Sequence, residues 1–131
     1  MTRLIFSLLV TGPAFGTDQS IRALNFARAV IQKGHAIKGV FFYQDGVLNA
    51  SAFLLPESDE PNPSLEWVDL ANEHHIQLHV CIAAAQRRGI IDSVIATENN
   101  LLGSTAQSTF QLSGLGQLAE LMLSSDRFIQ F

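Results

Sequence analysis

Cysteine, tryptophan and tyrosine are nearly absent from this 131-residue chain, which contains one of each. The single thiol, Cys81, cannot close a disulfide within the chain, so any sulfur chemistry must pass between molecules. No signal peptide is evident at the start of the sequence. An unpaired thiol without a secretion signal predicts a protein of the reducing cytoplasm.

Positive charge is also scarce. Eight lysines and arginines face twelve acids, and the formal net charge is -4. Proteins that bind nucleic acid generally present a basic surface, so direct contact with RNA or DNA is not expected. Long hydrophobic runs are missing too: the apolar stretch at residues 4–10 ends at a Thr-Gly-Pro turn and is too short to cross a membrane.

Apolar residues, in contrast, are abundant, at 47% of the chain with nine phenylalanines. That supply is generous for a domain of this size, so part of the apolar surface is expected to be buried against partner subunits. No repeat or linker interrupts the pattern. The sequence therefore predicts one folded domain over residues 1–131.

Runs of apolar residues predict five strands, at residues 4–10, 37–43, 76–84, 110–112 and 127–131. Helical periodicity predicts four helices, at about residues 18–33, 64–74, 91–97 and 114–123. Thr17 or Asp18 is expected to cap the first helix, and Ser64 the second. Alternating strands and helices indicate an α/β fold with a parallel sheet covered by helices on both faces.

In parallel sheets, functional sites form at the carboxyl ends of the strands. Three loops are therefore expected to meet there: residues 12–17, residues 44–49, and the stretch after Cys81. The first loop follows a strand and precedes a helix, but it has no lysine and matches no phosphate-binding fingerprint. Asp45 and Gly46 indicate a turn rather than a catalytic acid.

Two interpretations of Cys81 follow from the residues alone. Cysteine is among the most buried residue types, so Cys81 can be a packed core residue. Alternatively it is a sulfur nucleophile, which needs a stabilised thiolate. Arg87 and Arg88 are the nearest fixed cations along the sequence and are candidates for that electrostatic support.

His79 shares a strand face with Cys81, because two residues separate them. The spacing is long for a direct bond, so a packed histidine that hydrogen-bonds to a neighbouring backbone group is favoured over a base or charge partner for the thiol. One cysteine with scattered histidines gives no metal-ligand spacing, and neither a metal nor another cofactor is expected.

Four stretches of the chain, in order, match a known family. They are residues 10–17 (VTGPAFGT), 40–47 (VFFYQDGV), 81–89 (CIAAAQRRG) and 112–120 (LSGLGQLAE). On these motifs the chain resembles the DsrE/DsrF-like family, and within it the TusD-like chains, over essentially its whole length.

The resemblance implies a three-layer α/β/α domain with a five-stranded, mainly parallel sheet. It also implies TusB-like and TusC-like partner subunits, assembled as a dimer of heterotrimers. Cys81 then corresponds to the family's active cysteine. It would accept persulfide sulfur from a TusA-like donor and pass it to a TusE-like acceptor, for thiouridine synthesis at the tRNA wobble position.

Three alternatives stay open at this point. A DsrE-type subunit of dissimilatory sulfur oxidation shares the cysteine motif. A non-catalytic scaffold subunit would use Cys81 only for packing. A small-molecule binder would use the crevice at the sheet edge, although the missing phosphate fingerprint argues against it.

Overall fold

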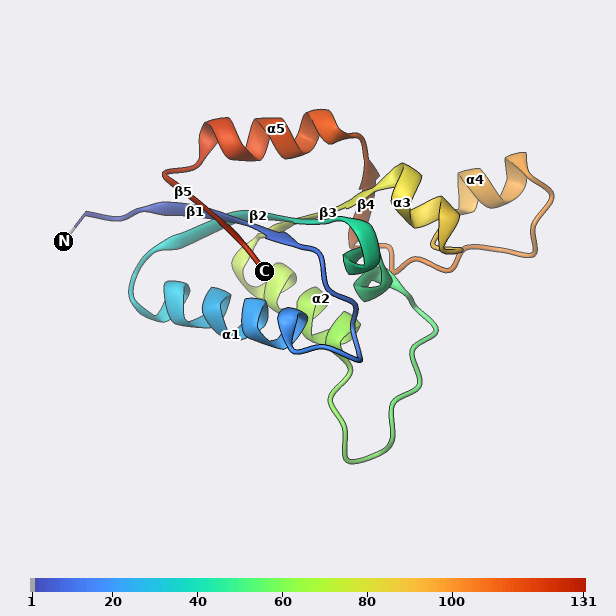
Figure 1. The fold of residues 1–131 in the computed structure, drawn as a ribbon, viewed down its shortest axis with the longest axis horizontal. Coiled ribbons are helices and arrows are strands. Elements are labelled where there is room, and N and C mark those ends of the chain that lie inside the picture. Colours follow the sequence, from blue (N-terminus) through green and yellow to red (C-terminus); the bar gives the residue numbers. More distant parts are fainter. Residues whose placement is uncertain (1) are drawn as a thin grey trace.

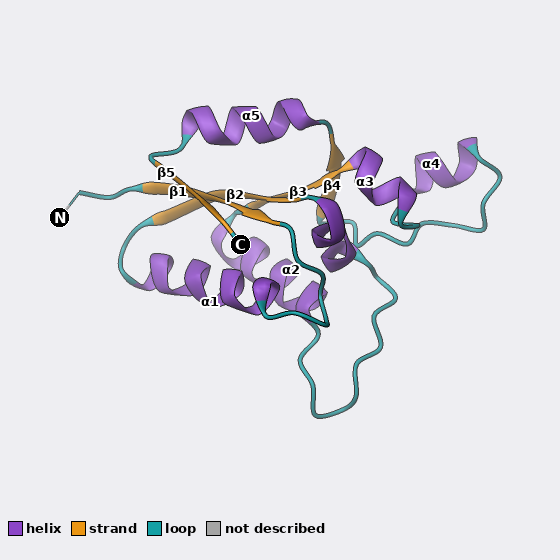
Figure 2. Ribbon diagram, viewed as in Figure 1, coloured by secondary structure: helices purple, strands orange, loops and turns teal. Residues whose placement is uncertain are grey.

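The computed structural model describes residues 2–131, which form one parallel five-stranded sheet with the strand order β4-β3-β2-β1-β5. The strands alternate with helices along the chain and run in the same direction (Figures 1 and 2). Their bounds are β1 Ile5–Val10, β2 Ala36–Phe42, β3 Gln77–Cys81, β4 Phe110–Ser113 and β5 Arg127–Gln130. The predicted parallel α/β fold is confirmed.

Helices cover both faces of this sheet, as Figure 2 shows. Two helices, α1 (Gln19–Gln32) and α2 (Pro63–His74), lie on one face, and α5 (Leu115–Ser124) crosses the other face alone. Beyond the carboxyl ends of the strands lie η1 (Gln44–Ala50), α3 (Ile82–Arg87) and α4 (Ser93–Glu98). The three layers α/β/α are therefore unequal, with more helix on one side than the other.

The central strands are apolar on both faces because both faces are covered. On the α1/α2 side, the ring of Phe42 packs edge-on against Trp67 at 5.3 Å and against Phe110 at 5.3 Å. On the other side, Leu121 is the buried residue of α5 and packs against Gly39. A Cβ at position 39 would lie 2.8 Å from the Leu121 side chain, so glycine lets α5 approach the sheet closely.

Of the two sequence predictions about helix starts, the one for α2 was wrong, and the one for α1 gave the right residue without the expected side-chain hydrogen bond. Ser64 does not cap α2, because Asn62 is the N-cap: its side chain accepts a hydrogen bond from the Leu65 amide at 3.3 Å, and Pro63 occupies the first helical position. Ser64 is instead buried, and its hydroxyl has no partner within residues 2–131. Asp18 is the N-cap of α1, but its side chain makes no capping hydrogen bond.

Two boundaries also differ from the prediction at the carboxyl edge. The third strand ends at Cys81 rather than at residue 84, since the small residues that follow form α3. The stretch from Gln44 is a 3₁₀ helix, η1, and not a simple turn. Cys81 thus lies at the junction where strand becomes helix. None of the helices in residues 2–131 has the length and apolar content needed to cross a membrane.

Candidate functional site

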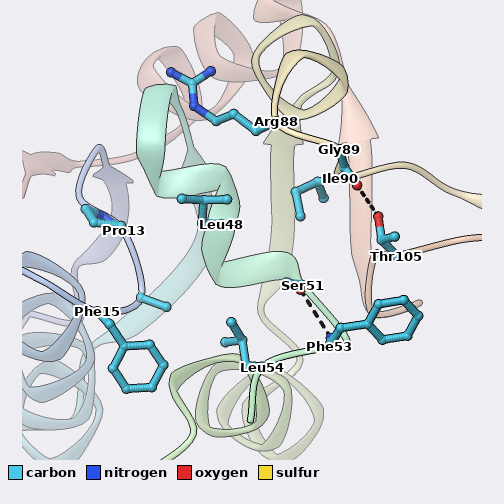
Figure 3. A pocket seen from close by; sticks show the side chains of 11 residues that line it. Pro13, Phe15, Leu48, Ser51, Phe53, Leu54, Arg88, Gly89, Ile90 and Thr105 are labelled. Atoms are coloured by element: carbon cyan, nitrogen blue, oxygen red, sulfur yellow. Dashed lines mark hydrogen bonds between the residues drawn. The ribbon is translucent and has the colours of Figure 1, made fainter. Parts of the chain in front are cut away.

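The three loops predicted to meet at the carboxyl edge do meet there, around an open crevice of about 340 Å³ (Figure 3). The loop after β1 forms one wall, η1 and the residues after it form the floor, and the end of α3 forms the rim. The lining is largely apolar and comprises Pro13, Ala14, Phe15, Leu48, Ser51, Phe53, Leu54, Arg88, Gly89, Ile90 and Thr105. Cys81 is not among these residues.

A buried polar network fixes two of these walls. The amide nitrogen of Asn49 donates to the carbonyl oxygens of Gly12 at 3.0 Å and Gly46 at 2.8 Å. Its amide oxygen accepts from the hydroxyl of Ser20 at 2.6 Å, and that hydroxyl accepts from the indole N–H of Trp67 at 3.1 Å. Asn49 therefore ties the loop after β1, η1 and helix α1 together, which the sequence analysis missed.

Arg88 holds the end of α3 against η1. Its Nε donates to Asp45 Oδ1 at 2.9 Å, and its Nη1 donates to the carbonyl oxygen of Ala84 at 3.0 Å. The guanidinium lies over η1 in Figure 3. Its positive charge is thus partly compensated by Asp45, so Arg88 acts mainly as a clamp between two loops.

Arg87 differs from its neighbour. It is exposed, and no ion pair joins it to any residue between 2 and 131. In the same range, neither Arg87 nor Arg88 donates a hydrogen bond to Cys81. Electrostatic support of the thiol by these two arginines stays a prediction, and Arg87 is the one whose charge remains available to a partner.

Cys81 is a free thiol with 5% of its surface exposed, and it packs with the hydrophobic core. The residue that follows, Ile82, is 37% exposed, and Ala83 is exposed as well. Cys81 is the last residue of β3 and the N-cap of α3, so the thiol lies at the carboxyl edge of the sheet. In the isolated chain, it is covered rather than open to solvent.

His79 is buried, as the packed interpretation predicts, although its partners are side chains rather than backbone groups. Its Nδ1 lies 2.8 Å from the hydroxyl of Ser113, and its Nε2 lies 3.0 Å from Oε1 of Gln77. Burial lowers the pKa of His79 below its usual 6.5, while the nearby carboxylate of Glu120 acts in the opposite direction. The ring is therefore neutral at pH 7.

Within residues 2–131, no three side chains of His, Cys, Asp or Glu come together as a metal site. The chemistry that the carboxyl edge offers comes from one thiol, a neighbouring hydroxyl, a neutral imidazole and two arginines. This is a set suited to sulfur nucleophile chemistry.

A sequence model of the DsrE/DsrF-like family matches residues 5–131, almost the whole chain. The chain belongs to the DsrE/DsrF-like family. The predicted resemblance to this family is confirmed.

Curated relatives agree with this assignment. The chain is 51% identical to a sulfurtransferase TusD of Pectobacterium atrosepticum over 128 residues, covering 98% of this chain and 99% of the relative. It is 49% identical to a sulfurtransferase TusD of Proteus mirabilis, covering 98% of both chains. The likeness to TusD chains that the motifs predict is thus confirmed.

The fold also has a solved counterpart. The crystal structure of the ychN protein from E. coli superposes with a TM-score of 0.75, covering 99% of this chain and 100% of that one, at 17% sequence identity. At that identity the match supports the three-layer fold alone.

Proposed function

We propose that this chain is a sulfurtransferase subunit in which Cys81 carries sulfur as a persulfide. The observation that carries the proposal is the chain's one thiol, placed where β3 ends and α3 begins, in a protein about half identical to sulfurtransferases. The sulfurtransferase class itself is confirmed by these relatives, which match at 49–51% identity over nearly the whole chain. The carrier role of Cys81 is the part that needs a test.

The chemistry balances without a cofactor. The Cys81 thiolate attacks the outer sulfur of a donor persulfide, so a new S–S bond forms and the donor's S–S bond breaks, with the donor sulfur leaving as a thiolate. An acceptor thiolate then attacks the outer sulfur on Cys81 in the same manner. The Cys81 thiolate is regenerated, and no net oxidation or reduction takes place.

The partners that we propose are those that the resemblance to TusD chains implies. A TusA-like donor and a TusE-like acceptor would each visit Cys81 transiently, and the final product would be thiouridine at the tRNA wobble position. TusB-like and TusC-like subunits would assemble with the chain as a dimer of heterotrimers. The exposed apolar side chains of α5 support burial against such subunits: Leu115, Met122 and Leu123 are 51%, 52% and 88% exposed.

The burial of Cys81 sets a condition on the proposal. A visiting thiol reaches the sulfur only if the groups that cover it shift or if the assembled complex opens it. Because α3 is only six residues long and its first two residues, Ile82 and Ala83, are exposed, movement of this segment is one route by which the thiol could open. Local opening of a short segment costs less free energy than global unfolding.

The direct test is a sulfur-loading experiment on the assembled complex. Incubation with a persulfide-charged donor should add one sulfur atom to this chain, detected by intact-mass spectrometry, and a reductant should remove it. The Cys81→Ser variant should gain no mass. If the wild-type chain gains none, while the donor is charged and the complex is otherwise active, the carrier role is wrong.

One rival gains support from the structure. The 5% exposure of Cys81 is what a non-catalytic scaffold subunit would show. In that case Cys81→Ser would leave sulfur transfer through the complex unchanged. A role in sulfur oxidation uses the same sulfur step with a different final acceptor, and supplying each acceptor in turn to the charged complex separates the two pathways.

A further inference from the structure

The end of β4 brings a hydroxyl beside the thiol. In the parallel pairing of β3 and β4, Cys81 is aligned with Ser113, and His79 with Gln111. Aligned residues on neighbouring strands lie about 4.8 Å apart and point to the same face of the sheet. Sγ of Cys81 and Oγ of Ser113, each one bond beyond Cβ, can therefore meet within one hydrogen bond when their rotamers point at each other.

The same hydroxyl already contacts His79. Ser113 Oγ lies 2.8 Å from His79 Nδ1, whereas its contact with the carbonyl oxygen of Gln111 is longer, at 3.3 Å. Because His79 and Cys81 share one face of β3, Ser113 stands next to both. A side chain from the neighbouring strand thus contacts His79 and is aligned in register with Cys81, in the gap that separates these two residues.

The partner atoms of His79 determine which of its ring nitrogens donates a hydrogen bond and which accepts one. Oε1 of Gln77 has no proton to give, so His79 Nε2 carries the proton and donates to it at 3.0 Å. Burial keeps the ring neutral by lowering the pKa of His79, which leaves Nδ1 unprotonated. Nδ1 therefore accepts from the hydroxyl of Ser113, and the lone pairs of that oxygen stay free for another donor.

We propose that Ser113 relays the proton of the Cys81 thiol to His79. The S–H bond of Cys81 breaks as its proton moves to Ser113 Oγ, and the hydroxyl proton of Ser113 moves to His79 Nδ1. The products are a thiolate and an imidazolium joined through one hydroxyl, and no atom or charge is gained or lost. This inference rests on the proposed function of Cys81 and adds the group that ionises it.

The charges around this relay are few. From α5, the carboxylate of Glu120 faces His79 and favours its protonated form. Lys38 of β2 donates to that carboxylate at 2.9 Å, which moderates the effect. Arg88 is held by Asp45, so neither of these two charges enters the relay directly. Within residues 2–131 the hydroxyl of Ser113 bonds to His79 and Gln111 and not to Sγ of Cys81, so the contact with the thiol forms as the thiol reacts.

The experiment follows the rate at which iodoacetamide alkylates Cys81, the only thiol of the chain, from pH 5.5 to 9.5 by intact-mass spectrometry. Thiolate absorbance at 240 nm, with Cys81→Ser subtracted, gives the thiolate fraction independently. If the relay removes the proton as the thiol reacts, the alkylation rate of the wild-type chain at pH 7 should exceed the rate expected from its thiolate fraction alone. In Ser113→Ala the alkylation rate at pH 7 should be lower by about ten-fold or more, and at each pH it should follow the measured thiolate fraction.

Two further variants make the test specific. Ser113→Thr keeps the hydroxyl and should stay within about two-fold of wild type, and His79→Asn keeps an acceptor but takes up no proton, so it should behave like Ser113→Ala. Ser108→Ala, an exposed serine just before β4, is the matched control and should change nothing. Circular dichroism establishes that each variant is folded.

Two results would overturn the relay: a Ser113→Ala profile identical to wild type, or no alkylation of the folded wild-type chain under conditions where the unfolded chain reacts. Failure of the carrier role appears differently. In that case the alkylation rate still depends on Ser113, but the charged donor adds no sulfur to Cys81. If only the relay fails, Ser113→Ala takes up sulfur as fast as wild type.

Discussion

Replacing Asn49 by alanine should destabilise the protein strongly, because Asn49 is fully buried and joins three segments at the carboxyl edge. The change removes the hydrogen bonds to the carbonyl oxygens of Gly12 and Gly46 and the one accepted from Ser20. Each such bond contributes about 1 kcal/mol, and buried groups left unpaired add to the loss. The free energy of unfolding should therefore fall by about 3–5 kcal/mol.

That loss is a large part of the total stability of a domain this size, about 5–15 kcal/mol. With an unfolding entropy of about 2.1 cal/mol/K per residue over the 131-residue chain, it corresponds to a decrease in Tm of about 11–18 °C. Chemical denaturation followed by circular dichroism, and calorimetry for Tm, measure both quantities. Asn49→Asp should be no better, since a carboxylate cannot donate to the two carbonyl oxygens.

The matched control is Asn25→Ala, at an exposed asparagine of α1, which should change stability by less than about 0.5 kcal/mol. A loss below about 1 kcal/mol for Asn49→Ala would refute the argument, because it would mean that the network contributes no more than one ordinary hydrogen bond.

The remaining predictions concern single side chains. Ser64→Ala should leave the free energy of unfolding unchanged or raise it by about 1 kcal/mol in urea denaturation, because the buried hydroxyl has no partner within residues 2–131; a clear loss would contradict this. Arg88→Gln should lower that free energy by about 1 kcal/mol by breaking the pair with Asp45, whereas Arg87→Gln should leave it unchanged. If both arginine variants lose the same stability, the clamp is misassigned. The unfolded chain protonates His79 near pH 6.5 but the folded chain only at lower pH, so the contribution of His79 to stability should decline as pH falls below 6.5, by up to about 1.4 kcal/mol per pH unit. Denaturation of wild type and His79→Asn at pH 5.5 and 7.5 measures it, and an equal pH dependence in both proteins would contradict it.

The fold could be predicted well because its signals are local. Apolar runs of strand length alternate with helical periodicity, and a parallel sheet follows from that order. The N-cap at Asn62 could also have been predicted from the sequence, because asparagine followed by proline at the first helical position is a typical helix start. The prediction of Ser64 relied on serine being a common N-cap residue and did not consider Asn62 before Pro63.

The candidate site was less accessible to sequence reasoning, because its contacts join distant segments. Asp45 and Arg88 are 43 residues apart, and His79 and Ser113 are 34 apart. Only the register of β3 against β4 reveals that Ser113 lies beside Cys81. The burial of Cys81 depends on how distant segments of the chain pack around the end of β3, and residue types alone do not fix it.

The position of β1 has a consequence for how the protein forms during synthesis. β1 pairs with β2 on one side and with β5 on the other, and its Ile5 amide binds the carboxylate of Asp126, 121 residues later. At translation rates of about 5–20 residues per second, the first strand waits roughly 6–24 s for its second neighbour. During that interval a nascent chain presents an apolar strand with an open hydrogen-bonding edge, which is the stage at which it is most exposed to mispairing and to capture by chaperones.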